Sequence, residues 1–187
     1  WPQRGGQPVR AGQEVPTAAL VVGRPGCGKS CGVRLVGQMA QRRVMEYSLD
    51  DQSGLRFLDN LLKRQRTARD VTEAKDTLVV LDVPDDPSQA LRDKLAPAVR
   101  ASPHPIILTC AEETAKSIGA VQKTCIQVEV CPESMVVARA LGDLAVKEEL
   151  GPLPESFEAM AAGCGGDWRN AVLRLQLLSA APASTLP

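Results

Sequence analysis

Short apolar runs along the chain are separated by stretches with helical periodicity. The runs are almost uniformly apolar, which is typical of strands buried in a parallel sheet. We predict strands at residues 19–22, 44–49, 77–82, 105–110 and 125–130. Apolar residues spaced three or four apart predict helices over residues 55–62 and 88–99, and one from residue 33 to near Arg42 and Arg43. Alternating strands and helices predict an α/β fold: a five-stranded, doubly wound parallel sheet with helices on both faces.

The pattern changes after residue 130, where Cys131 and Pro132 follow the last predicted strand. From there the periodicity predicts three helices, with apolar positions at Val137, Leu141 and Leu144, at Phe157, Met160 and Ala161, and at Trp168, Val172 and Leu175. Asp167 is placed to cap the third helix. We therefore divide the chain into a nucleotide-binding domain, residues 1–130, and a small helical domain, residues 131–187, called the lid below. We expect only the region around Cys131 and Pro132 to join them, so that their relative orientation is soft without ligand.

The segment between the first strand and the first helix matches the pattern G-x-x-x-x-G-K-[ST]. It is Gly-Arg-Pro-Gly-Cys-Gly-Lys-Ser, residues 23–30, called the phosphate loop below. Its glycines allow a turn whose backbone N–H groups point inward at phosphate oxygens, and the following helix adds its positive N-terminal dipole. The alternative is an ordinary glycine-rich turn between a strand and a helix. We predict a nucleotide site formed by Gly23, Arg24, Pro25, Gly26, Cys27, Gly28, Lys29, Ser30 and Cys31.

A carboxylate ends the third predicted strand, Thr-Leu-Val-Val-Leu-Asp at residues 77–82. In phosphate-loop proteins an aspartate at this point, the Walker B aspartate, holds the shell of a magnesium ion, and the loop hydroxyl takes another position on the ion. The alternative is an aspartate that merely ends the strand. We predict ATP and Mg²⁺ as cofactors, with Ser30 and Asp82 at the metal and Lys29 at the β- and γ-phosphates. Lys29 and Asp82 are therefore candidate catalytic residues.

Composition narrows the class of protein but not its partners. Apolar residues make up 44% and charged residues 24% of the 187 positions, which suits a packed globular protein, and the net charge is zero. No overall field therefore favours nucleic acid or a membrane. A basic cluster at residues 63–66 could touch a DNA backbone, although a solvated helix end is the favoured interpretation. The six cysteines form no C-x-x-C pair, which favours reduced thiols in a cytosolic or nuclear protein.

The end of the chain narrows the family. Residues 165–171, Gly-Gly-Asp-Trp-Arg-Asn-Ala, with Leu175 and Gln176 downstream, resemble the G-D-x-R…L-Q signature of clamp-loader subunits. A phosphate-loop sheet followed by a three-helix lid also looks like an AAA+ ATPase module. The resemblance implies that Arg169 is the sensor 2 arginine, which reaches from the lid to the γ-phosphate, a role that suits a permanently charged, forked guanidinium. Without the resemblance, Arg169 would be a solvated residue in the first turn of a helix.

Among clamp loaders, the chain most resembles the large subunit of the DNA-damage checkpoint clamp loader, a Rad-type relative of replication factor C. Three features carry this likeness: Leu-Asp-Val-Pro at residues 81–84, Ala-Gly-Cys-Gly-Gly-Asp at residues 162–167, and Trp1 ahead of the phosphate loop. It implies small clamp-loader subunits, a ring-shaped sliding clamp and, through the assembly, DNA as partners. It also implies a nuclear protein of the damage checkpoint and cell cycle, of DNA repair or of replication; no membrane partner is expected.

The chain departs from the family at three positions. Val83 stands where a catalytic glutamate would polarise the attacking water, and Asp85 and Asp86, beyond Pro84, are expected to lie too far along to replace it. Sensor 1 aligns with Ala111, with Thr109 and Glu112 as substitutes. Lys-Thr-Cys at residues 123–125 stands where small subunits carry an arginine finger. We therefore expect ATP to be bound well and hydrolysed weakly.

Two other functions compete with this one. A small-molecule kinase would need an acceptor pocket and arginines in a mobile segment between strands, and we find neither. A scaffold with a purely structural phosphate loop is disfavoured because Lys29 and Ser30 are both intact. The chain begins with Trp1 rather than Met, and we expect it to be a fragment of a longer protein.

Overall fold

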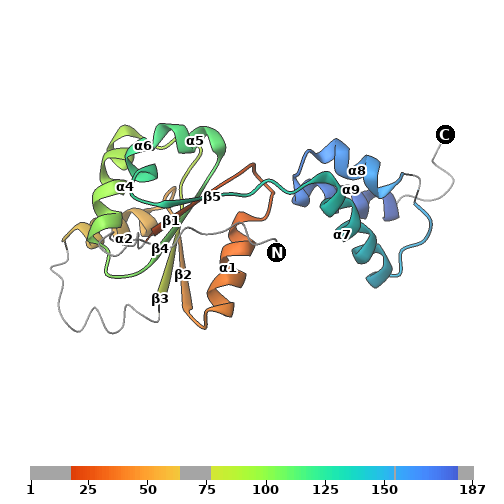
Figure 1. Ribbon diagram of the computed structural model, residues 1–187, viewed down its shortest axis with the longest axis horizontal. Helices are drawn as coiled ribbons and strands as arrows, with labels where there is room; N and C mark the ends of the chain where they lie inside the picture. The colour runs from red at the N-terminus through yellow and green to blue at the C-terminus, as the bar shows by residue number, and fades with distance from the viewer. Residues whose placement is uncertain (1–17, 64–76, 154, 181–187) are drawn as a thin grey trace, which may run out of the picture.

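The computed structural model describes residues 18–63, 77–153 and 155–180 (Figure 1). The first part of the chain forms a five-stranded sheet in the order β2-β3-β4-β1-β5, and every pair of neighbouring strands is parallel. The strands are β1 (Ala18–Val22), β2 (Arg43–Ser48), β3 (Thr77–Asp82), β4 (Ile106–Cys110) and β5 (Ile126–Glu129). The predicted α/β fold is confirmed, because each apolar run does form a parallel strand. All carboxyl ends of the strands therefore meet at one edge of the sheet.

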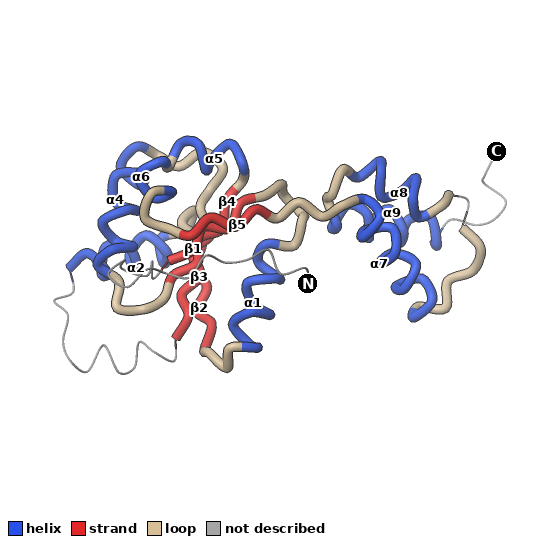
Figure 2. Tube along the Cα trace, in the orientation of Figure 1, coloured by secondary structure: helices blue, strands red, loops and turns tan. Residues whose placement is uncertain are grey.

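Helices cover both faces of the sheet (Figure 2). One face is covered by α1 (Lys29–Met39), whose Val33 packs with Val21 and Val80. The other face carries α2 (Gln52–Lys63), α4 (Gln89–Ala101), α5 (Glu112–Ser117) and α6 (Gly119–Gln122). The larger core lies on this second side and includes Leu20 and Leu108. Successive residues of β1 thus point to opposite cores, as expected for a strand that is buried on both faces.

The structure differs from the sequence prediction in the helices around this sheet. Helix α1 ends at Met39 and not near Arg42. Gln41 takes a left-handed conformation (φ 52°), and its N–H and that of Arg42 donate to Gln38 and Gly37. This is the Schellman arrangement that ends a helix, and it was not predicted because glycine usually occupies the left-handed position. The short helices α5 and α6, between β4 and β5, were not predicted either.

The lid contains three helices with a core of their own. They are α7 (Ser134–Lys147), α8 (Phe157–Cys164) and α9 (Trp168–Ala180), as the periodicity predicted. Leu141, Met160 and Leu175 are buried between them. The predicted cap of the last helix is present, because a carboxylate oxygen of Asp167 accepts a hydrogen bond from the N–H of Asn170 at 2.9 Å. In Figure 1 this bundle lies beside the amino-terminal end of α1.

Some predictions concern residues outside the described ranges. They involve Trp1 and the part of the basic cluster at residues 64–66. Within the described ranges, none of the helices is both long enough and apolar enough to cross a membrane.

Candidate nucleotide-binding site

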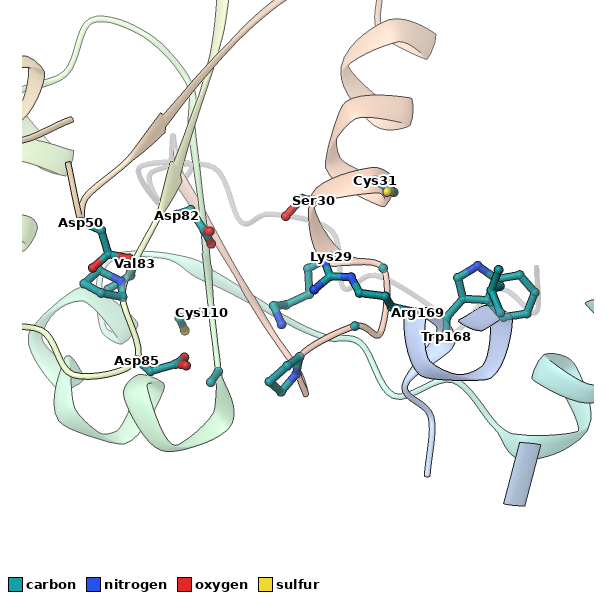
Figure 3. A pocket seen from close by; sticks show the side chains of 16 residues that line it. Lys29, Ser30, Cys31, Asp50, Asp82, Val83, Asp85, Cys110, Trp168 and Arg169 are labelled. Carbon is teal, nitrogen blue, oxygen red and sulfur yellow. The ribbon is translucent and has the colours of Figure 1, made fainter. Parts of the chain in front are cut away.

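A cavity of about 510 Å³ lies between the phosphate loop, the carboxyl ends of β3 and β4, and the first turn of α9 (Figure 3). This volume is within the usual range for small-ligand sites. The cavity is lined by Pro25, Gly26, Gly28, Lys29, Ser30, Cys31, Asp50, Asp82, Val83, Pro84, Asp85, Cys110, Ala111, Trp168, Arg169 and Val172. It therefore brings together the predicted Lys29, Ser30, Asp82 and Arg169.

The phosphate loop owes its shape to two glycines in left-handed conformations. Gly26 has φ 73° and Gly28 has φ 97°, a region that disfavours residues with a side chain. Gly28 immediately precedes α1, so Lys29 and Ser30 lie in the first turn of the helix. The ammonium of Lys29 donates to the carbonyl oxygens of Gly23 at 2.8 Å and Arg24 at 2.9 Å. Carbonyls carry only partial charge, so a phosphate would compete well for this ammonium.

Three residues of the predicted nucleotide set, Gly23, Arg24 and Cys27, do not line the cavity. Gly23 lies against β5, where an added Cβ would come within 2.4 Å of the carbonyl oxygen of Val130. Cys27 is buried, with its sulfur 3.0 Å from that same position. Arg24 directs a guanidinium N–H at the carbonyl of Gly165 in the lid at 3.4 Å. These side chains hold the loop against its surroundings.

Asp82 is held in place by a buried neighbour on the next strand. Parallel pairing of β3 and β4 sets Asp82 opposite Thr109, and the Thr109 hydroxyl donates to the Asp82 carboxylate at 2.6 Å. Thr109 is fully buried, so this hydroxyl is fixed. Of the three positions considered for sensor 1, Thr109 thus contacts Asp82 and Ala111 lines the cavity, whereas Glu112 is exposed at the start of α5. Val83 is buried and has no group that could accept a proton.

The cavity wall also contains a thiol, Cys110, at the end of β4. Burial raises the pKa of the Cys110 thiol to about 11; the nearby carboxylates of Asp82 and Asp85 raise it further and Lys29 opposes them. The thiol is therefore protonated at neutral pH and is a poor nucleophile. None of the six cysteines, all within the described residues, is paired in a disulfide.

Two acidic residues of the cavity were missed from the sequence. Asp85 was expected to lie too far along the chain, but it lines the same cavity as Asp82. The chain bends after Pro84, and the Thr114 hydroxyl of α5 donates to the Asp85 carbonyl at 2.9 Å, which fixes this bend. Asp50 reaches the cavity from the loop after β2, because β2 pairs with β3 in parallel register. Finding Asp50 requires the order of the strands, and finding Asp85 requires the path of the chain after Pro84; the sequence reveals neither.

The lid touches the phosphate loop directly, so the expectation that only the region around Cys131 and Pro132 joins the two parts is wrong. The N–H of Arg169 donates to the carbonyl of Gly26 at 3.3 Å, in addition to the Arg24 contact with Gly165. A Cβ added to Gly26 would lie 1.9 Å from a carboxylate oxygen of Asp167. Both hydrogen bonds are longer than the usual 2.9–3.0 Å, so they are weak and breakable. Figure 3 shows the Arg169 side chain directed from the lid toward Lys29.

The donors in this cavity fit a magnesium ion that is bound together with phosphate. Ser30 and Asp82 offer the oxygen ligands that Mg²⁺ prefers. Among the described residues no group of three or more His, Cys, Asp or Glu could hold a metal without help. Phosphate oxygens and water would therefore have to complete the coordination shell.

Comparisons with known proteins bear on the fold more than on the activity. No protein-family model matches the chain. The chain is 25% identical over 182 residues to replication factor C subunit 1 of Arabidopsis thaliana, a match that covers 87% of this chain and 19% of that protein. A solved structure of Thermotoga maritima RuvB superimposes with a TM-score of 0.63 at 14% identity, over 85% of this chain and 53% of that one. The chain thus spans about a fifth of the curated relative, to which it is weakly similar in sequence, and its fold of a five-stranded parallel α/β sheet with a phosphate loop is similar to that of RuvB.

Proposed function

We propose that this chain is the ATP-binding AAA+ part of a clamp-loader-like subunit that acts on DNA. The observation that carries the proposal is the cavity itself, because it brings Lys29 and Ser30 of α1 and Asp82 of β3 together with Arg169 of the lid. These groups match the parts that phosphoryl-transfer sites use: a lysine and a hydroxyl on the phosphates and metal, a carboxylate on the metal shell, and an arginine for the terminal phosphate. The similarity to replication factor C subunit 1 supports the clamp-loader assignment.

Each side chain has a separate task in the proposed site. The Lys29 ammonium leaves the carbonyls of Gly23 and Arg24 and binds the β- and γ-phosphates. The Ser30 hydroxyl and the Asp82 carboxylate, oriented by Thr109, hold magnesium, whose charge neutralises the phosphates when it is bound. Arg169 contacts the γ-phosphate from the lid, so ATP joins lid and sheet more firmly than ADP. The lid, residues 131–187, thereby moves in response to the nucleotide.

We propose that hydrolysis is weak and depends on the assembly. Val83 stands where a carboxylate would activate water, and it is buried and cannot accept a proton. Asp85 lines the cavity, where its backbone carbonyl accepts a hydrogen bond from Thr114, but it lies beyond Pro84 and is not expected to replace the glutamate. Binding, and not rapid turnover, would then be the output of this subunit.

The proposed partners follow from the clamp-loader resemblance. They are small clamp-loader subunits, a ring-shaped sliding clamp and DNA held by the assembly. The finer proposal is a nuclear role in the DNA-damage checkpoint, and it rests on the Leu-Asp-Val-Pro segment at residues 81–84 and on the Gly-Cys-Gly-Gly-Asp segment at residues 163–167. Recovery of small clamp-loader subunits with the full-length protein would support it, and recovery with a replicative clamp alone would favour replication.

The test of the site is ATP affinity in the presence of Mg²⁺, measured by calorimetry on the parent and on Lys29→Ala. A charged phosphate contact contributes about 1.5–3 kcal/mol, so we expect the variant to bind ATP about 10-fold more weakly or worse. Lys147→Ala is the matched control, because Lys147 is exposed in α7 and does not line the cavity. Equal affinity of parent and Lys29→Ala would reject the site. A parent that binds no ATP would favour a scaffold whose phosphate loop is only structural.

A further inference from the structure

A second cavity, of about 480 Å³, lies in the lid between the end of α7 and the beginning of α8. In Figure 1 the segment that joins these two helices is on the side of the lid away from the sheet. Among the residues that the structure describes, none lines both this cavity and the nucleotide cavity. We call it the lid groove, and its apolar lining includes Ala145, Val146, Leu150, Leu153 and Phe157.

The floor of the lid groove is apolar because it belongs to the lid core. Leu150, Leu153 and Phe157 are partly buried and pack against that core. The ring of Phe157 lies against α7 at Gly142, where an added Cβ would be 3.5 Å from it. Val146 is 79% exposed, so the groove also leaves apolar surface in contact with water. Covering this surface with apolar side chains of a partner would be favourable.

Carboxylates surround this apolar floor, because Glu149, Glu155 and Glu158 also line the groove. Arg174 pairs with Glu155 at 2.8 Å, whereas Glu149 and Glu158 form no ion pair with any described residue. The carboxyl end of α7 lies here as well, and the end of a helix dipole favours cations. The segment 142–158 is strongly acidic overall, with Asp143, Glu148, Glu149, Glu155 and Glu158 against one base, Lys147.

Glu149 occupies a backbone position that usually carries glycine. It has φ 51°, its N–H donates to the Val146 carbonyl, and the N–H of Leu150 donates to the Ala145 carbonyl at 3.0 Å. This is a Schellman end of a helix, in which the left-handed residue is favoured to lack a side chain. Among the described residues other than glycine, only Gln41 at the end of α1 shares this conformation. A glycine at each of the two positions therefore separates the needs of the backbone from the role of the carboxylate.

We propose that the lid groove binds a basic peptide segment of a partner protein. Its leucine-like side chains would cover the apolar floor, and its Lys or Arg side chains would meet Glu149 and Glu158. The charge of the rim decides the class of partner, because the phosphates of a nucleic acid would face these same carboxylates. The lid groove uses no residue of the nucleotide cavity, so this binding goes beyond the proposed function and does not depend on it.

The probe is a synthetic twelve-residue peptide of leucine and lysine, with the leucines on one face of a helix. Its titration into the ¹⁵N-labelled chain, followed by the NMR shifts of the backbone amides, reports affinity and location together. We expect the shifts to centre on Val146, Leu150 and Phe157. A peptide with glutamate in place of lysine, or with serine in place of leucine, should bind about 10-fold more weakly or worse.

The first variant, Glu149→Lys combined with Glu158→Lys, reverses the charge of the rim at two exposed positions. We expect it to bind the lysine peptide about 10-fold more weakly or worse, with a smaller difference at high salt. Asp93→Lys combined with Glu129→Lys is the matched control, because it changes the net charge equally at exposed positions outside the groove.

The second variant, Glu149→Gly, removes the carboxylate and suits the left-handed backbone. We expect it to keep or raise the thermal midpoint and yet to bind the peptide about 2- to 5-fold more weakly, as for one exposed charge pair. Gln41→Gly is its control, which should keep or raise the thermal midpoint and leave peptide binding unchanged. A purely structural role of Glu149 would leave binding unchanged in both glycine variants.

A loss of peptide affinity in the charge-reversed rim, but not in its control, would support the inference. Equal affinities in the two, shifts centred on the nucleotide cavity, or no binding to the parent at millimolar peptide would overturn it. Self-association of the chain that the reversed rim abolishes would make a second copy the occupant, and larger groove shifts with a DNA oligonucleotide would make it nucleic acid; either result overturns the inference. ATP affinity should stay at the parent value in every variant, so failure here leaves the proposed function standing.

Discussion

The two walls of the cavity are held together in different ways. The wall formed by the sheet consists of a contiguous loop, shaped by the left-handed Gly26 and Gly28, and of strand ends fixed by parallel pairing. The wall formed by the lid depends on contacts between distant positions, and Arg24 and Gly165 are 141 residues apart in sequence. Its two hydrogen bonds to the loop are 3.3 and 3.4 Å long. We therefore expect the wall formed by the sheet to keep its shape and the wall formed by the lid to be the part that a ligand can shift.

The largest expected effect comes from the residue at which the two walls meet. Gly26→Ala adds a Cβ at a left-handed φ, which costs about 1–2 kcal/mol, and forces it toward the Asp167 carboxylate that caps α9. We expect ATP affinity to fall by about 10-fold or more and the lid to leave its position on the loop.

Calorimetry and a fluorescence distance between lid and sheet would measure both changes. Gly32→Ala is the control, because Gly32 is exposed in α1 and an added Cβ meets nothing within 4 Å. Unchanged affinity and unchanged distance in Gly26→Ala would mean that the loop does not transmit its state to the lid.

The next largest effect is expected at the wall formed by the lid, and it should differ between ATP and ADP. Arg169→Ala removes the guanidinium that the lid directs at the phosphates but keeps the phosphate loop. One charge-assisted contact contributes about 1.5–3 kcal/mol, so we expect most of the difference in affinity between an ATP analogue and ADP to disappear, a change of about 10- to 150-fold.

ADP affinity itself should change little in Arg169→Ala. Arg174→Ala is the control, since Arg174 pairs with Glu155 at 2.8 Å and does not line the cavity. If Arg169→Ala still distinguishes ATP from ADP and the lid still closes, Arg169 is a surface residue.

A smaller effect on the Mg²⁺ requirement is expected from a change within the wall formed by the sheet. Thr109→Val keeps the shape of the buried side chain and removes the hydroxyl that orients Asp82. The loss of one hydrogen bond to an exposed carboxylate is about 1 kcal/mol, so the Mg²⁺ concentration that supports half-maximal ATP binding should rise about 5-fold. Thr124→Val is the control, because the Thr124 hydroxyl donates to the carbonyl of Val121 and neither residue lines the cavity. An unchanged Mg²⁺ requirement would show that Asp82 needs no support from β4.

The smallest effect lies outside both walls and depends on pH. Arg34 of α1 donates to the Glu46 carboxylate of β2 at 2.6 Å, and this hydrogen bond lowers the pKa of Glu46. A lowered folded-state pKa contributes stability above the unfolded value, and this stability is lost as the pH falls through the folded-state pKa. We expect Glu46→Gln to lower the thermal midpoint slightly at neutral pH and to match the parent in strong acid, with ATP affinity unchanged.

The Arg34–Glu46 pair is largely exposed, so its contribution is small. Thermal unfolding between pH 2 and pH 7 would measure the difference, with Glu129→Gln on the exposed β5 as control. A difference that persists unchanged into strong acid would point to packing and not to charge.

Local patterns predicted most of the sheet. The runs that form β1, β3 and β4 are mostly buried, and such apolar runs need no information from distant residues to be recognised. All five strands were placed to within one or two positions. The end of α1 was misplaced because Gln41, and not glycine, takes the left-handed position there. The helices α5 and α6 were missed because each is only a turn or two long, too short for a periodicity to appear.

The sequence by itself determined the phosphate loop, the aspartate at the end of β3 and the cap of α9, because each depends on residues that are neighbours in the chain. Only the tertiary structure decided which side chains share the cavity. The strand order β2-β3-β4-β1-β5 brings Thr109 and Asp50 to Asp82, and the bend after Pro84 turns Asp85 back toward the strand end. The contact of α9 with Gly26 brings Trp168 and Arg169 to the phosphate loop. Apart from the bend after Pro84, these contacts join segments far apart in sequence, and a single chain carries no local signal for them.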